Sequence, residues 1–489
     1  MRWIFALVLA LAFRTGTAAS CSSWITSGDQ KYLLARQPDV PFQSSNSSSP
    51  CTDPTRCIFI DDSVLFQEID GFGAAMTESS AYVLKQLPSD LYERAMKDLF
   101  DRDQGIGVSF VRIPMGTCDF ALDSTTYDDT KDDYSLAHFS VNRDMRYLIP
   151  VLQHAQEIRR GYVPPGGALR PLYFMGTPWS PPTWLKTSKA IGYGTLLPTV
   201  QARTTLANYF VRFIQAYANV GLPIYAVTIQ NEPLFEPRGY GGMHLDASQE
   251  VDIAIEMNRA FQQAGLDTKI TVYDHNWDNA SYPLHILQNA AARNAIAGTA
   301  WHCYAGDVAV QIPVHDAYPE KETYLTECSG GAWAPDFDGN LLWDTTVLII
   351  GGMRGWSRAV LKWNLVLDQK DGPTHGGCLN CRGFLTADLS AKPPTLRRES
   401  EWYVFGHVAK FVESGARRAE SRFAADQPQP DVGALQHVAF VNPREGTAVL
   451  VVANPGKNDV AFELAHRSSV APQVIPARSV MTLVWPLAH

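Results

Sequence analysis

Two glutamates lie in sequence contexts where acid–base chemistry is expected. Glu232 follows Asn231 in the segment Gln230-Asn-Glu-Pro233, and Glu327 lies in Thr326-Glu-Cys328. Each follows a short apolar run of the kind that forms a buried strand. A pair of carboxyl groups can hydrolyse a glycosidic bond, because one protonates the departing oxygen while the other attacks the anomeric carbon or activates water. If both side chains face one site, glycoside hydrolysis is the chemistry that they predict.

Polar and aromatic residues follow several of the other apolar runs. Asp119 and Asn231 can hydrogen-bond to sugar hydroxyls, and Trp179, Tyr304 and Trp363 can pack against the C–H faces of a sugar ring. Each has an ordinary structural alternative, since a buried Trp is more often a core residue and a Glu after a strand often has a structural partner. Their joint placement after strands is what favours a sugar site.

Metal chemistry is less well supported by the sequence. A metal-dependent isomerase on the same scaffold would need several further Asp, Glu or His residues at strand ends, and only Asp119 and His302 are available. The motif Cys378-Leu-Asn-Cys381 lacks the second cysteine pair of a structural zinc site. We therefore expect no metal and no cofactor. A catalytically inactive, carbohydrate-binding barrel is the alternative from another class, and the presence of both glutamates argues against it.

The elements that must position these residues form a repeating pattern. Eight short apolar runs alternate with amphipathic helices, including 88–100, 145–158, 206–220 and 249–264, which predicts an α/β fold of the (β/α)8 TIM-barrel type. In such a barrel the residues after each strand meet at one face. A doubly wound sheet is the alternative, but the glycine-rich turn Gly71-Phe-Gly73-Ala-Ala-Met76 lacks the third small residue of a dinucleotide-binding fingerprint. The eight runs are 66–73, 108–114, 171–177, 224–230, 270–273, 299–302, 323–326 and 359–363.

A second, smaller domain is predicted from the two ends of the chain. From about residue 416 the sequence changes to strand-like segments separated by turns, which predicts a small antiparallel β domain. This segment is short for an independent sandwich, so we expect the chain around 57–60 to supply further strands. The Ser- and Pro-rich residues 22–56 are expected to be extended and irregular. The predicted boundaries are 21–65 for the N-terminal segment, 66–414 for the barrel and 415–489 for the β-sandwich domain.

The composition and the N-terminus predict an exported protein. Lys and Arg total 41 against 50 Asp and Glu, a net charge of −9, which argues against nucleic acid as a partner. Residues 1–20 are typical of a signal peptide, and no later stretch is apolar for long enough to span a membrane. In an exported chain with eight cysteines we expect a disulfide between Cys51 and Cys57, with Cys378 and Cys381 as a second candidate pair.

Several longer motifs resemble those of glycoside hydrolase family 30, whose members include glucosylceramidases. They occur in order and cover nearly the whole predicted barrel. They are Asp70-Gly-Phe-Gly-Ala-Ala-Met-Thr77, Arg112-Ile-Pro-Met-Gly-Thr-Cys-Asp-Phe120, Pro178-Trp-Ser-Pro-Pro-Thr-Trp-Leu-Lys-Thr187, Ala226-Val-Thr-Ile-Gln-Asn-Glu-Pro233, Thr326-Glu-Cys328 and Lys362-Trp-Asn364.

The resemblance implies a retaining β-glycosidase with a β domain packed on the barrel. By this resemblance Glu232 would be the acid/base, Glu327 the nucleophile and Asn231 a ligand of the sugar 2-hydroxyl. Because an acid must hold a proton, we expect the pKa of Glu232 to lie above about 4.3. The remaining assignments place Asp119 and Trp179 at the outer hydroxyls, Trp363 at the floor of the site, and Arg112, His302 and Tyr304 as braces of the two glutamates.

The substrate expected from the resemblance is a β-glucoside, with glucosylceramide preferred. Hydrolysis of that glycolipid would involve peripheral contact with a lipid surface, and the enzyme would be secreted, or lysosomal in a eukaryote. The loop Gly376-Gly-Cys-Leu-Asn-Cys-Arg-Gly383 departs from the lysosomal pattern and is more similar to microbial relatives. An endo-β-1,6-glucanase or a β-xylosidase therefore remains the alternative within the family.

Overall fold

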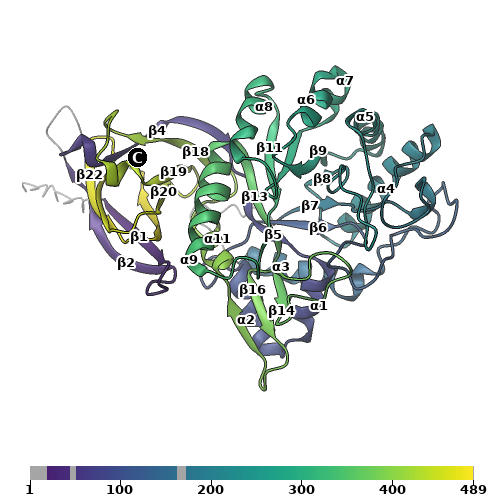
Figure 1. Cartoon of the computed structure of the whole chain (residues 1–489), viewed down its shortest axis with the longest axis horizontal. Helices are drawn as coiled ribbons and strands as arrows, with labels where there is room; N and C mark the ends of the chain where they lie inside the picture. The colour runs from purple at the N-terminus through teal and green to yellow at the C-terminus, as the bar shows by residue number, and fades with distance from the viewer. Residues whose placement is uncertain (1–18, 45–50, 162–171, 488–489) are drawn as a thin grey trace, which may run out of the picture.

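The computed structural model describes residues 19–44, 51–161 and 172–487, which form a barrel and a β-sandwich side by side (Figure 1). The predicted signal peptide therefore lies outside the described residues except for its last two positions. Among the residues described, no helix is both long enough and apolar enough to cross a membrane.

Eight parallel strands close into a barrel, which confirms the predicted TM-barrel fold. Around the barrel they follow the order β10-β11-β13-β5-β6-β7-β8-β9. Most of their residues are buried, because helices cover the outside and packed side chains fill the inside. Their bounds are β5 Gly71–Ala75, β6 Phe110–Pro114, β7 Tyr173–Thr177, β8 Ala226–Thr228, β9 Lys269–Asn276, β10 Gly298–His302, β11 Glu322–Glu327 and β13 Ser357–Asn364.

Two differences between the predicted runs and the observed strands are informative. The run 66–73 is divided, because Phe66 belongs to the end of β4 (Cys57–Glu68) in the sandwich, and β5 begins only at Gly71. Between these strands the chain passes from one sheet to the other, and Asp70 is held there by Arg358 with an Nη2–Oδ1 distance of 2.8 Å. The run 270–273 is too short, because β9 continues through a bulge at Asp274.

Some of the helices around the barrel begin or end at recognisable capping residues. Thr199 caps α4, its hydroxyl accepting a hydrogen bond from the Ala202 N–H at 3.1 Å, so this helix begins six residues before the predicted start. Gly265 ends α5 in the left-handed conformation, with φ of 65°. The helices are α1 Glu78–Gln86, α2 Ser89–Phe100, α3 Leu148–Gly161, α4 Val200–Asn219, α5 Ala247–Ala264, α6 Ser281–Gln288, α7 Ala290–Ala295, α8 Gln311–Ala317, α9 Phe337–Trp343, a π-helix Asp344–Gly351, α10 Gly352–Arg354, α11 Ser400–Ala409 and α12 Pro430–Gly433.

The second domain is a ten-stranded sheet built from both ends of the chain, as predicted. Its order is β2-β1-β23-β20-β19-β18-β4-β21-β22-β3, and every pair is antiparallel except β4 with β21. The sheet folds around its own apolar core, separate from that of the barrel. The bounds not yet given are β1 Ser20–Ser27, β2 Ala35–Pro41, β3 Gln43–Ser44, β18 Arg417–Phe423, β19 Gln436–Asn442, β20 Thr447–Asn454, β21 Val460–His466, β22 Ser469–Ile475 and β23 Ser479–Pro486.

The prediction that residues 22–56 are irregular is wrong for the first half of this segment. Strands β1 and β2 form there as a hairpin, and β1 also pairs with β23 along most of its length. Alternate positions of β1, including Cys21 and Ile25, are buried, while Ser residues occupy many of the positions between them. The high serine content hid this alternation in the sequence.

Helices α9 and α11 lie between the two domains (Figure 1). Both pack against β23, and α11 also packs against β5 of the barrel. The buried His407 of α11 hydrogen-bonds to Thr482 at 2.8 Å and to Thr26 at 2.9 Å, so it connects the barrel to both chain ends. The two domains are therefore joined by a buried interface.

Three disulfides are formed among the described residues. Cys51 pairs with Cys57 and Cys378 with Cys381, which confirms both expected pairs. The third, between Cys303 and Cys328, was not predicted. It joins the loops that follow β10 and β11, immediately beside Glu327.

Candidate active site

The C-terminal ends of the barrel strands bring the predicted site residues together. Arg112 lies on β6, His302 ends β10 and Glu327 ends β11, while Asn231 and Glu232 follow β8. Because parallel strands of a closed barrel end at the same face, these residues from distant parts of the sequence share one pit. The pit is largely closed to solvent, since Glu327 is only 6% exposed.

Arg112 is the fully buried centre of this arrangement. Its guanidinium contacts Glu327 through Nη1, and its Nη2 lies 2.7 Å from an oxygen of Asp274 and 2.8 Å from Oδ1 of Asn231. Burial alone would lower the pKa of Arg112, but the two carboxylates outweigh it and raise the pKa. Arg112 therefore fixes Glu327 and Asn231 relative to each other.

Asp274 is a member of the site that the sequence analysis missed. Its Oδ1 accepts from Thr326 at 2.6 Å and lies 3.0 Å from Nε2 of His302, while its Oδ2 accepts from Thr228 at 2.8 Å and from Arg112. Burial would raise the pKa of Asp274, but the charges of Arg112 and His302 lower it well below its usual range. Applying the strand-end rule to the fifth run would have found this residue.

The backbone at Glu232 has an unusual conformation. Its φ is 45° and that of Asp274 is 47°, a region that non-glycine residues seldom adopt. The N–H of Glu232 donates to the carbonyl of Asp274 at 3.0 Å, which holds the two segments together. Strained backbone of this kind persists where the surrounding contacts impose it, often at functional sites. Here it directs the Glu232 side chain towards His302.

His302 connects Glu232 to Asp274. Its Nδ1 lies 3.0 Å from Oε1 of Glu232, and its Nε2 lies 3.0 Å from Asp274. Burial would lower the pKa of His302, but the charges of Glu327 and Asp274 raise it to about 9. The same contact corrects our expectation for Glu232. Burial raises its pKa, but the hydrogen bond and charge of His302 outweigh this and lower it.

The two glutamates lie close enough to act on one bond. A carboxylate oxygen of Glu232 lies within 4.8 Å of one from Glu327, and the hydroxyl of Tyr304 donates to Oε1 of Glu327 at 2.8 Å. Carboxyl groups about 5 to 5.5 Å apart are typical of retaining glycosidases, whereas inverting enzymes leave about 6.5 to 9.5 Å for a water molecule. The separation fits the retaining geometry.

Two clusters of potential metal ligands occur among the described residues. In the first, Glu232, His302 and Glu327 offer atoms within 4.8 Å of one another, but Arg112 already neutralises Glu327 and the raised pKa of His302 favours its charged form. In the second, the thiols of Cys51 and Cys57 are joined in a disulfide and cannot act as thiolate ligands. Neither donor set fits a metal ion.

Aromatic residues form one wall of the pit. Trp179 and Trp363 stack with ring centroids 5.0 Å apart, and the guanidinium of Arg112 lies 4.8 Å from the Trp179 ring. Both indoles are almost completely buried. Tyr304 differs, since 45% of its surface is exposed at the rim.

Asp119 lies beside the two indoles and against the loop 376–383. Its Oδ2 accepts from the N–H of Cys378 at 3.4 Å, and a Cβ added to Gly377 would lie 2.1 Å from the Cβ of Asp119. Burial, followed by the charge of Glu327, raises the pKa of Asp119 to about 7. The loop that departs from the lysosomal pattern therefore contacts the residue predicted to bind the outer sugar hydroxyls.

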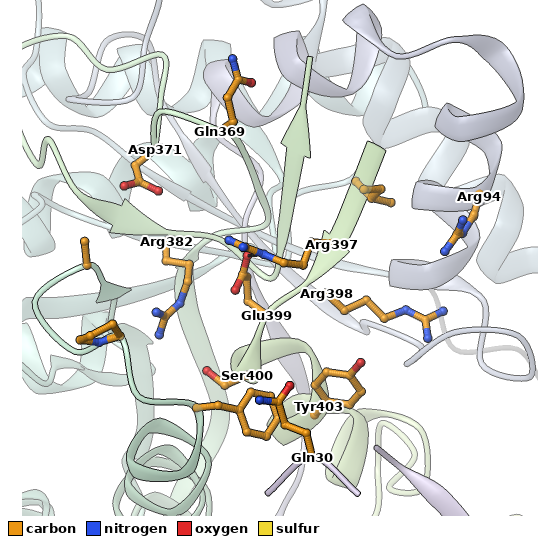
Figure 2. A pocket seen from close by; sticks show the side chains of 14 residues that line it. Gln30, Arg94, Gln369, Asp371, Arg382, Arg397, Arg398, Glu399, Ser400 and Tyr403 are labelled. Atoms are coloured by element: carbon orange, nitrogen blue, oxygen red, sulfur yellow. Dashed lines mark hydrogen bonds and ion pairs between the residues drawn. The ribbon is translucent and has the colours of Figure 1, made fainter. Parts of the chain in front are cut away.

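A cavity of about 800 Å³ lies elsewhere, where α2, the strands β15 (Cys381–Arg382) and β17 (Thr395–Arg398), and the start of α11 meet (Figure 2). Arginines gather around it, but Arg382 is paired with Glu401 at 2.8 Å and Arg398 with Asp98 at 2.6 Å. None of the nine predicted site residues lines this cavity. The carboxylate pair, and not this larger cavity, defines the candidate active site.

Comparison with known proteins identifies both domains of the chain. The profile of the "Glycosyl hydrolase family 30 TIM-barrel domain" matches residues 69–412, and that of the "Glycosyl hydrolase family 30 beta sandwich domain" matches residues 415–483. The chain is 31% identical to an endo-1,6-β-D-glucanase of Neurospora crassa, with 98% of each chain covered. It is 27% identical to the lysosomal acid glucosylceramidase of Mus musculus, with 86% of this chain and 81% of the relative covered.

Comparison with solved structures gives the same result. An endo-β1,6-glucanase superposes with a TM-score of 0.85 and 28% sequence identity, covering 96% of this chain and all of that one. The similarity therefore extends over both domains.

Proposed function

The chain belongs to glycosyl hydrolase family 30 and is a glycosidase, and from this premise we propose that it cleaves β-1,6-linked glucan by a retaining, double-displacement mechanism. The observation that supports this chemistry is the proximity of Glu232 and Glu327, whose carboxylate oxygens approach within 4.8 Å. The two carboxylates also have different partners, suited to different chemical roles. Glu232 contacts His302, whereas Glu327 contacts Arg112 and Tyr304.

In the first step, Glu327 attacks the anomeric carbon as the bond to the leaving oxygen breaks. Glu232 gives a proton to that oxygen, and a glucosyl ester on Glu327 results. In the second step, Glu232 removes a proton from water, the water oxygen attacks the anomeric carbon, and the carboxylate of Glu327 is released. Arg112 and Tyr304 stabilise the departing carboxylate, and Asn231 binds the sugar 2-hydroxyl.

The lowered pKa of Glu232 requires a source for the first proton. His302 carries one below about pH 9 and points its Nδ1 at Oε1 of Glu232. We therefore assign the acid function to the pair, in which the proton moves from His302 to Glu232 as the leaving oxygen gains charge. Asp274 balances the positive charge of the His302 imidazolium through its contact with Nε2.

The choice of glucan as substrate depends on the relatives. The sequence motifs favour glucosylceramide, but the endo-1,6-β-D-glucanase of Neurospora crassa matches over 98% of both chains. The superposed glucanase matches over 96% of this chain and over its own full length. These comparisons support the alternative better. Three disulfides are also typical of exported proteins, which fits an enzyme that meets glucan outside the cell.

The chemistry is tested by trapping the intermediate with a 2-deoxy-2-fluoro-glucosyl fluoride and mapping the labelled peptide. We expect the label on Glu327, and a label on another residue would contradict the proposal. Glu232→Gln should lose far more activity on substrates with poor leaving groups than on activated aryl β-glucosides. Equal losses of activity on the two kinds of substrate would contradict the role of Glu232 as the acid.

The substrate is tested with a panel of β-1,6-glucan, detergent-dispersed glucosylceramide, aryl β-glucoside and aryl β-xyloside. We expect internal cleavage of β-1,6-glucan, detected as a series of oligosaccharides. If glucosylceramide is cleaved and the glucan is not, the enzyme is a glucosylceramidase and acts at a lipid surface. Preference for the aryl β-xyloside would indicate a β-xylosidase.

A further inference from the structure

A pocket next to the catalytic pair is not used by the mechanism above. It has a volume of about 500 Å³ and lies between the loops after β10 and β11 and helix α9. We call it the tryptophan pocket, because Trp333 and Trp343 line it together with Tyr304. These three are among the few large aromatic side chains that are strongly exposed in the described structure, at 54%, 44% and 45%. Exposed aromatic clusters of this kind mark binding sites.

The tryptophan pocket shares Tyr304 with the catalytic pit. The hydroxyl of Tyr304 donates to Glu327 at 2.8 Å, while its ring lines the pocket. The Cys303–Cys328 disulfide fixes the two loops between the pocket and the pit. The tryptophan pocket therefore lies next to the place where the bond at Glu327 reacts, with Tyr304 between them.

The orientation of Trp333 is set by the backbone beneath it. A Cβ added to Gly331 would lie 2.1 Å from the Trp333 ring, so the indole packs directly on this glycine. Gly331 belongs to the short strand β12 (Gly330–Gly331), which pairs with Cys381 and Arg382 of β15. The exposed indole is therefore held on a rigid support and does not rely on a flexible loop.

The polar groups of the tryptophan pocket are suited to a neutral ligand that carries hydroxyls. The amide nitrogen of Asn340 donates to the carbonyls of Ala334 and Asp336, both at 2.6 Å, which directs its amide oxygen away from these contacts as an acceptor. Asp336 adds an exposed carboxylate, and no Lys or Arg lines the pocket. Aromatic faces combined with acceptors fit a sugar ring, and an anionic glycan would meet the negative charge.

From these observations we infer that the tryptophan pocket binds a further glucosyl unit of the same β-1,6-glucan chain that Glu232 and Glu327 cleave. This inference rests on the proposed function. It gives the enzyme an extended binding site, in which a chain is held at the pit and again beyond Tyr304. Chain-length preference would then come from Trp333 and Trp343.

The test compares kcat/KM on β-1,6-linked gluco-oligosaccharides of two to six units with kcat/KM on an aryl β-glucoside. For Trp333→Ala and Trp343→Ala we expect the ratio of the longest oligosaccharide to the aryl glucoside to fall about tenfold. Gly331→Ala keeps the Trp333 ring but would place a Cβ 2.1 Å from it and 2.4 Å from the Asn380 carbonyl, so this variant should lower the ratio in the same direction. Ile255→Ala, on the outer helix α5 and 37% exposed, is the matched control that should leave the ratio as in wild type.

A binding measurement separates affinity from turnover. In a Glu327→Gln background, calorimetry with the hexasaccharide should give a Kd about tenfold higher when Trp333 is also replaced by Ala. If wild-type enzyme cleaves the oligosaccharides but the tryptophan variants keep its length preference, the inference is overturned and the proposed function stands. If wild type cleaves no β-1,6 linkage, both fail before any variant is compared. A loss confined to glucosylceramide would assign the pocket to a lipid chain and would also overturn the inference.

Discussion

Replacing Asp274 by Asn tests the buried network most directly. Its two oxygens accept from or contact four groups, on Arg112, Thr228, His302 and Thr326. An amide keeps the size but removes the charge, and it turns one acceptor into a donor that faces other donors. The side chains of Arg112 and Asp274 are both fully buried, so water cannot replace the lost contact. Removing one partner of a buried ion pair costs about 3–5 kcal/mol. We expect the free energy of unfolding at pH 7 to fall by at least about 3 kcal/mol.

The size of this effect should depend on pH in a defined direction. The pKa of Asp274 is lowered in the folded protein, so its contribution is fully present above the unfolded value of about 3.9 and declines as pH falls below it. The difference between wild type and Asp274→Asn should therefore shrink in acid. The variant also removes one of the charges that raise the pKa of His302. The alkaline limb of the pH–activity profile should then move below about pH 9.

Urea unfolding at pH 7 and at pH 3, with a pH–rate profile on an aryl β-glucoside, measures both effects. Asp431→Asn is the control, because its ion pair with Arg56 is exposed, at 42% and 38%, and such pairs contribute about 0–1 kcal/mol. The reasoning is refuted if Asp274→Asn costs no more than this control at pH 7. An unmoved alkaline limb would refute the assignment of the proton to the His302 pair.

Three further outcomes are expected. Gly377→Ala should raise KM for an aryl β-glucoside about tenfold, because its Cβ would displace Asp119. The control Gly161→Ala, whose Cβ would meet nothing within 4 Å, should leave KM unchanged. Equal KM values for the two variants would refute the contact between Gly377 and Asp119. Burial raises the pKa of Asp119 to about 7, so the free energy of unfolding of wild type should fall as the pH rises from about 4 to about 7. Urea unfolding of Asp119→Asn should not show this fall. A constant difference between the two would show that Asp119 is ionised throughout. Replacing Cys303 and Cys328 together by Ser should cost about 3 kcal/mol of unfolding free energy, as expected for opening a 25-residue loop, and a cost below about 1 kcal/mol would contradict this.

Much of the site could be predicted because the barrel makes strand ends informative. Glu232, His302 and Glu327 each follow an apolar run, and the barrel places all such positions at one face. Asp274 directly follows the fifth apolar run, so the same rule reaches it, and the β-bulge there extends the strand beyond the run. The sequence pattern ends at Tyr273, whereas the strand continues to Asn276.

Other features depend on contacts that sequence spacing does not reveal. The Cys303–Cys328 disulfide forms because two neighbouring strands end side by side, although the cysteines lie 25 residues apart. The lowered pKa of Glu232 depends on the position of His302, so a rule based on the role of a catalytic acid gave the wrong direction. The hairpin β1–β2 was hidden by the high serine content of β1, in which Ser23 and Ser27 are buried while Ser20 and Ser22 are partly exposed. The second partner of β1 is β23, which lies at the far end of the chain.

The sandwich built from both chain ends determines the order in which this protein can fold. Strand β1 pairs with β23, with Trp24 opposite Thr482, and β4 pairs with β18 and β21. During synthesis β1 can pair with β2 at once, but its pairing with β23, and that of β4 with β18 and β21, must wait until the barrel segment has been made. Contacts so distant in sequence form late, because a very long loop must close before they contribute any stability. The barrel can fold as a unit first, and the last residues added to the chain then complete the second domain.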